Sequence, residues 1–156
     1  MRITLRRVVL QVSRAANRKV IATEDRKARL LTLWVFLMFN FVYADVLALF
    51  DIIYNGKLGS IQFTPATLLG VSVLMEIPMA MVILSWVLKY RANRWTNIIA
   101  GTAYALVTLS IQFILPISSG TTTTYYLFFG AIEILTTSFI VWYAWKWPQA
   151  EVSASK

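Results

Sequence analysis

The sequence predicts an all-α membrane protein, an antiparallel bundle of four transmembrane helices connected up-down-up-down. Composition is the first observation, since 58% of the 156 residues are hydrophobic, against about 45–50% in an average soluble domain. The second is segmentation, because the apolar residues form four runs of about 20 residues, each long enough to cross a hydrocarbon core of about 30 Å. The third is charge, because the basic residues lie outside these runs and almost all on one side of them.

A basic leader, residues 1–29, begins the chain. We expect it to be a disordered cytoplasmic arm or an amphipathic helix that lies on the membrane surface. It is not a signal peptide, because its apolar run at residues 8–10 is too short. Its charges should contact anionic lipid headgroups. Its basic residues are Arg2, Arg6, Arg7, Arg14, Arg18, Lys19, Arg26, Lys27 and Arg29.

A transmembrane domain, residues 30–147, follows the leader, and a short tail, residues 148–156, ends the chain. The predicted spans cover residues 30–53, 66–88, 95–115 and 125–145. Pro65 opens the second span, where a missing N–H costs nothing, and Pro78 should kink it. Pro116 and Pro148 should end the third and fourth spans. The connections are short, so successive helices should be antiparallel neighbours.

The basic residues also predict the orientation of the chain. The loop between the second and third spans and the residues after the fourth span together carry Lys89, Arg91, Arg94, Lys146 and Lys156. The two other loops contribute only one, Lys57. The positive-inside rule therefore predicts a multi-pass protein of the cell (cytoplasmic) membrane with both termini in the cytoplasm. Because topology accounts for the net charge of +8, nucleic acid is not an expected partner.

Neither Cys nor His occurs in the sequence. This excludes disulfide exchange, thiolate metal sites, haem held by His and Ser-His hydrolysis. A Gly-rich phosphate loop is also missing. We therefore expect no metal site and no cofactor. Any catalysis would depend on Asp, Glu, Tyr, Ser, Thr, Lys or Arg.

Three carboxylates fall inside the predicted spans, and charged side chains at bilayer depth are rare and often functional. Asp45 lies in the first span, Glu76 in the second and Glu133 in the fourth. At 1.5 Å per residue, all three lie about 16–21 Å from the cytoplasmic edge. Because no Lys or Arg lies at this depth, either bound protons or a bound cation must neutralise them. We predict that these three acids bind a ligand or protons.

Polar residues at helical spacing share the faces of these acids and should line a pocket inside the bundle, because lipid cannot satisfy them. The third span has no acid, but its polar residues fall within a sector of about 80°. Three residues should roof the pocket on the outer side: Tyr126, Gln112 and Asp51. The other expected lining residues are Ser72, Tyr104, Thr108 and Thr137.

Residues 33–51 (LWVFLMFNFVYADVLALFD) and 75–101 (MEIPMAMVILSWVLKYRANRWTNIIAG) resemble a group of prokaryotic four-span membrane proteins of unknown function. The resemblance covers residues 30–147 and leaves the leader unmatched. It implies the fold and a choice of residues, but no activity. It adds Asn40 to the expected pocket lining. The matching residues are Asn40, Tyr43, Ala44, Asp45, Asp51, Glu76, Pro78, Lys89, Tyr90, Arg91, Asn93, Arg94 and Asn97.

Two characterised families resemble this chain only in their use of carboxylates inside a membrane bundle. The small multidrug-resistance transporters have four spans and exchange protons for lipophilic cations at a membrane glutamate. Their glutamate lies in the first span, where this chain has Asp45. The sterol-isomerase and sigma-two receptor group uses two carboxylates in a bundle to bind amines or a carbocation, but its motifs do not align with this sequence.

The sequence leaves three functions open, in the following order. The first is binding or transport of a small cationic or lipophilic ligand, or of protons, at the intramembrane carboxylates. The second is an intramembrane enzyme on a lipid-like substrate, with a carboxylic acid as proton donor and a carboxylate that stabilises positive charge. The third is a structural or accessory subunit, in which the acids join helices for about 0.6–2 kcal/mol each. A homo-oligomer is also compatible with the sequence.

Overall fold

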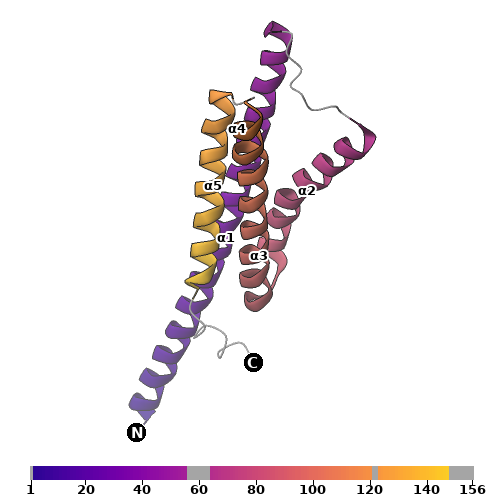
Figure 1. The fold of residues 1–156 in the computed structure, drawn as a ribbon. Coiled ribbons are helices and arrows are strands. Elements are labelled where there is room, and N and C mark those ends of the chain that lie inside the picture. Colours follow the sequence, from indigo (N-terminus) through magenta and orange to yellow (C-terminus); the bar gives the residue numbers. More distant parts are fainter. Residues whose placement is uncertain (1, 56–63, 121–122, 148–156) are drawn as a thin grey trace.

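The computed structural model describes residues 2–55, 64–120 and 123–147, and its regular elements within these ranges are helices (Figure 1). In this part of the chain, four helical segments are long and apolar enough to span a membrane: Leu10–Tyr54, Pro65–Val87, Tyr90–Ser119 and Thr124–Trp145. They correspond to the four predicted spans, so the predicted all-α membrane fold is confirmed. Lys57, Pro148 and the predicted tail lie outside the described residues.

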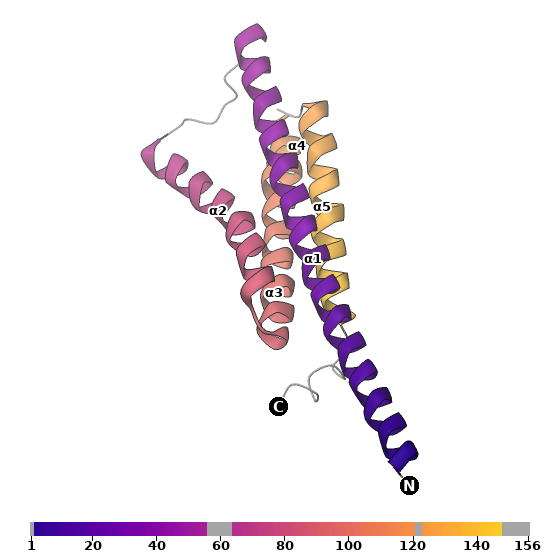
Figure 2. The same ribbon diagram turned by 180° about the vertical axis from the view of Figure 1, so that it is seen from behind.

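The first helix, α1 (Arg2–Asn55), is 54 residues long and joins the predicted leader and first span in one element. Neither Gly nor Pro occurs before residue 56, and Arg, Lys and Ala are good helix formers. Nothing in the sequence therefore ends the helix at the membrane surface. The structure thus differs from the expected disordered or surface-lying arm, because residues 2–29 continue the line of the span and project beyond the other helices (Figures 1 and 2).

The second helix, α2 (Pro65–Val87), begins with a capped first turn, because the Thr64 hydroxyl accepts a hydrogen bond of 3.1 Å from the Thr67 backbone N–H. Its C-terminal half packs on α1, whereas its N-terminal half diverges from the bundle in both ribbon views (Figures 1 and 2). The buried residues of α2 are Pro78, Met81 and Ser85. The helix is thus anchored to the bundle at one end only.

Three consecutive elements form the third span: α3 (Tyr90–Thr108), the π-helix η1 (Leu109–Ile114) and α4 (Leu115–Ser119). The prediction that Pro116 ends this span is wrong, because Pro116 lies in the first turn of α4. The fixed φ of Pro116, about −65°, is compatible with a helical turn. The span ends instead at Gly120, whose φ of 67° is the left-handed conformation typical of a helix C-cap.

The last described helix, α5 (Thr124–Trp145), packs closely on α3. Gly101 allows this approach, because a Cβ at that position would lie only 2.8 Å from Val141 Cγ2 of α5. Successive spans run in alternating directions (Figure 1). A hydrophobic core fills the half of the bundle where α3 begins and α5 ends. Its buried members are Leu30, Trp34, Leu37, Met81, Tyr104, Ile140 and Trp147.

Candidate functional site: a buried carboxylate between three helices

Glu133 of α5 is the centre of a polar cluster in the middle of the bundle, and its side chain has no exposed surface. Asn40 Nδ2 of α1 donates a hydrogen bond of 3.1 Å to Glu133 Oε1. Glu133 Oε2 accepts hydrogen bonds from Gln112 Nε2 of η1 at 2.7 Å and from Thr108 Oγ1 of α3 at 3.4 Å. We call these four residues the Glu133 cluster. Three neutral donors thus surround one carboxyl group, and they come from both neighbouring spans.

The backbone around Glu133 is held by the same kind of contact. Thr137 Oγ1 donates to the Glu133 backbone carbonyl at 2.7 Å. Asn40 Nδ2 also donates to the Phe129 carbonyl, one turn earlier on α5, at 3.2 Å. The first of these hydrogen bonds lies within α5, and the second joins α5 to α1 one turn from Glu133.

Gln112 reaches Glu133 from η1, and π-helical turns are frequent at functional sites. The carbonyl oxygen of its side chain is buried and has no hydrogen-bond partner among the described residues. It lies against Gly130 of α5, where a Cβ would overlap it and would also lie 2.8 Å from Phe113 Cε2. Gly130 therefore provides the space that lets the Gln112 amide lie beside the Glu133 carboxyl group.

Asp45 is half-buried on α1, close enough to Glu133 for the two acids to interact electrostatically. Tyr104 and Tyr126 also interact with both acids. The ring of Tyr104 is buried and packs edge-on against Phe41, with ring centroids 5.2 Å apart. Two neighbouring carboxyl groups repel when both are ionised.

Asp51 does not roof the Glu133 cluster but lies farther along α1, in an open hollow of about 820 Å³ between α1 and α5. Tyr125 donates its hydroxyl to Asp51 Oδ2 at 3.4 Å. The hollow is lined by Leu47, Asp51, Thr123, Thr124, Tyr125, Phe128 and Phe129. It combines one carboxylate with aromatic rings at the end of the bundle away from the core.

The structure does not bring Ser72 or Glu76 of α2 to the Glu133 cluster, in contrast to the expectation that their face turns inward. Both residues are exposed. Ser72 donates to the Leu68 carbonyl of its own helix at 2.9 Å. At 100° per residue, Glu76 lies about 140–200° around α2 from the three buried residues of that helix. The sequence shows which residues of α2 share a face, but not which face packs on the bundle.

A second buried cluster explains the orientation of α2; the sequence analysis named Asn93 and Asn97 only as residues of the resemblance and did not predict their cluster. Trp34 Nε1 of α1 donates to Asn97 Oδ1 of α3 at 2.7 Å. Asn97 Nδ2 donates to Asn93 Oδ1 at 2.6 Å, and Asn93 Nδ2 donates to the Ser85 carbonyl of α2 at 2.6 Å. None of these four side chains is exposed. We call them the Asn97 cluster. The four-residue spacing of Asn93 and Asn97 was the signal in the sequence.

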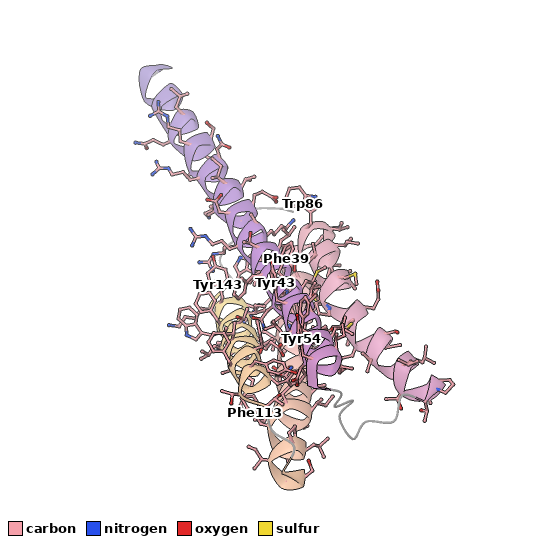
Figure 3. The ribbon with its side chains drawn as sticks, turned by 90° about the horizontal axis from the view of Figure 1, so that it is seen from above. Phe39, Tyr43, Tyr54, Trp86, Phe113 and Tyr143 are labelled. Carbon is pink, nitrogen blue, oxygen red and sulfur yellow. The ribbon has the colours of Figure 1, made fainter. Side chains whose placement is uncertain are left out.

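Basic side chains lie over aromatic rings at the end of the bundle where α5 ends. This is the arrangement expected at a membrane interface. Tyr143, one of these aromatic residues, lies on the side of α5 that faces α1 (Figure 3). The pairs, with the distance from the charged atom to the ring centroid, are Arg26–Tyr143 at 5.5 Å, Arg94–Trp145 at 5.7 Å and Lys146–Trp142 at 4.6 Å.

A model of a protein family described as "Family of unknown function (DUF6326)" matches residues 18–154. This range contains the second, third and fourth spans, most of α1 and both polar clusters. The chain belongs to this family. Comparison with curated proteins and with solved structures found no match. The family match includes part of residues 2–29 of α1, which we call the α1 extension and which the resemblance seen in the sequence did not cover. Because the family description names no activity, the function has to be argued from the site.

Proposed function

We propose that this protein binds a proton at Glu133 and belongs to the class of membrane proteins that bind or transport small cations. The observation that carries the proposal is the complete burial of Glu133, with no basic side chain among its hydrogen-bond partners. A buried carboxylate without a cation is costly in a low-dielectric interior. A proton is the one cation that needs no cavity, whereas a larger ligand would have to displace Asn40, Thr108 or Gln112.

The orientation of the chain is part of this proposal. Arg26, Arg94 and Lys146 lie at one end of the bundle, and the positive-inside rule assigns that end to the cytoplasm. The α1 extension then reaches into the cytoplasm from the cell membrane. Nitrogen-tipped side chains stand clear of the other helices along it (Figure 3). Anionic lipid headgroups are the partners that suit this charge.

A second candidate function is the binding of a lipophilic cation in the hollow that contains Asp51. The hollow combines a carboxylate with the rings of Tyr125, Phe128 and Phe129, and aromatic faces attract organic cations. Asp45 lies farther along α1 in the direction of Glu133. A cation in the hollow would therefore repel a proton on the buried acids, which is the coupling that an exchanger needs. The enzymatic and accessory roles have no comparable observation in their favour.

Glu133→Gln tests the proposed proton site. The amide has nearly the same shape and accepts hydrogen bonds, but it cannot take up a proton. In infrared difference spectra of the protein in lipid, recorded across a pH titration, we expect Glu133→Gln to lose the C=O stretching band of a protonated carboxylic acid.

The matched control is Glu76→Gln, because Glu76 lies outside the Glu133 cluster. This variant should keep the band that Glu133→Gln loses. A Glu133→Gln variant that kept every titrating acid band of the wild-type protein would contradict the proposal. In sealed vesicles, a cation-driven change of internal pH that Glu133→Gln abolishes would establish transport in addition to binding.

A further inference from the structure

Glu76 lies in the middle of α2, on the face that turns away from the bundle. The buried face of this helix, marked by Met81 and Ser85, lies on the opposite side. Both ribbon views show no other described helix on the outer side of α2 (Figures 1 and 2). In a single copy of the chain, this carboxyl group would therefore lie at bilayer depth against lipid.

The exposed residues around Glu76 have the spacing of a helix-pairing seam. The spacing alternates between three and four residues, which is the pattern of two helices that cross at a small angle. A single polar residue in such a seam fixes the register and the number of helices. The exposed residues with this spacing are Leu69, Ser72, Glu76, Met79, Ile83 and Trp86. We call them the α2 seam.

The chemistry of Glu76 selects the partner. A carboxyl group at bilayer depth needs a hydrogen-bond partner or an opposite charge. The predicted second span, residues 66–88, contains no Lys or Arg, so a second α2 brings no opposite charge to it. A protonated carboxyl group, however, is both donor and acceptor. Its best complement without a charge is another carboxyl group, which a second copy of the chain would supply.

We propose that the α2 seam is the interface of a symmetric dimer in which Glu76 of one copy hydrogen-bonds to Glu76 of the other. Two copies that insert in the same direction have parallel α2 helices. A twofold axis along the membrane normal then places each seam residue opposite its own copy. Ser72, one turn from Glu76, is small and lets the two helices approach closely. This interface is separate from the proton site, because Glu76 is not in the Glu133 cluster.

Disulfide cross-linking tests the interface directly, because the chain contains no cysteine. With a mild oxidant in native membranes, Ser72→Cys should form a disulfide-linked dimer, since Cα atoms that face each other across such a seam lie within disulfide range. The control is Leu135→Cys on α5, where the side chain is 70% exposed to the surroundings of the bundle. We expect several-fold more cross-linked dimer for Ser72→Cys. Equal yields in the two variants would overturn the proposal.

A second measurement does not depend on the introduced cysteine. The mass of the protein in lipid nanodiscs or mild detergent should be that of a dimer. Glu76→Leu should raise the dimer dissociation constant about tenfold, because it removes the polar pair. Glu76→Gln should keep the dimer, since an amide also donates and accepts. A monomeric wild-type protein, or a Glu76→Leu variant as dimeric as wild type, would refute the proposed contact.

Discussion

Gly130→Ala should destabilise the protein by about 1–3 kcal/mol, the usual cost of forcing an extra methyl group into a packed interior. The new Cβ would overlap the side-chain carbonyl oxygen of Gln112 and lie 2.8 Å from Phe113 Cε2. Gln112 would have to move, and its 2.7 Å hydrogen bond to Glu133 would be lost. Unfolding of the purified protein in detergent measures the loss of stability, and the acid band of Glu133 should shift in the same variant.

Gly70→Ala is the matched control for this prediction. Gly70 lies on α2, and a Cβ there would have nothing within 4 Å. Because Ala is the better helix former by about 0.8–1.0 kcal/mol, this variant should be as stable as wild type or slightly more stable. The same helical preference acts at Gly130, so any loss of stability there comes from the overlap. If the two variants had the same stability, the space beside Gly130 would not be what positions Gln112.

The parts of the fold that the sequence predicted are those that depend on a periodic signal. Four long apolar runs predicted four spans, and in the third span Tyr104, Thr108 and Gln112 are all buried. The α1 extension was harder to predict, because a basic segment with few apolar residues is compatible with a disordered arm, with a helix on the membrane surface and with a helix that continues the span. The π-helix η1 depends on how one turn packs, so it leaves no pattern in the sequence.

Helical spacing also explains why the candidate site was predicted only in part. It showed that Ser72 and Glu76 share one face, but the direction of that face depends on contacts between helices. Asn93 and Asn97 bind Ser85 and so turn the opposite face of α2 inward. A polar residue in a membrane helix has two ways to be satisfied, inside its own bundle or against another chain. Glu133 takes the first, and we infer the second for Glu76.

Several of the residues that carry the family resemblance join helices. Asn40 links α1 to Glu133, and Asn93 and Asn97 are two of the four residues of the Asn97 cluster. Tyr90 and Arg94 of α3 donate to backbone carbonyls near the end of α5, at 3.0 Å and 3.2 Å. Such contacts satisfy carbonyls that a helix end leaves unpaired. These contacts therefore join the helices in the half of the bundle that we assign to the cytoplasm. The buried Glu133 lies next to this half.

Trp34→Phe should destabilise the protein by about 2 kcal/mol, through one lost hydrogen bond in the membrane and a cavity where the indole was. Trp34 is fully buried, although a Trp near the end of a membrane span often lies at the interface. Its Nε1 makes the 2.7 Å bond to Asn97 that ties α1 to α3. Thermal unfolding in a fixed detergent measures the effect.

Trp95→Phe controls for the change of residue type, because Trp95 is 55% exposed and has no such bond among the described contacts. It should change stability by less than about 0.5 kcal/mol. The double variant Trp34→Phe with Asn97→Ala then isolates the contact itself. If the hydrogen bond couples the two residues, the double variant should lose about 1 kcal/mol less than the sum of the single variants. Strict additivity would mean that Trp34 acts only by filling space, and that Asn93 and Ser85 orient α2 without it.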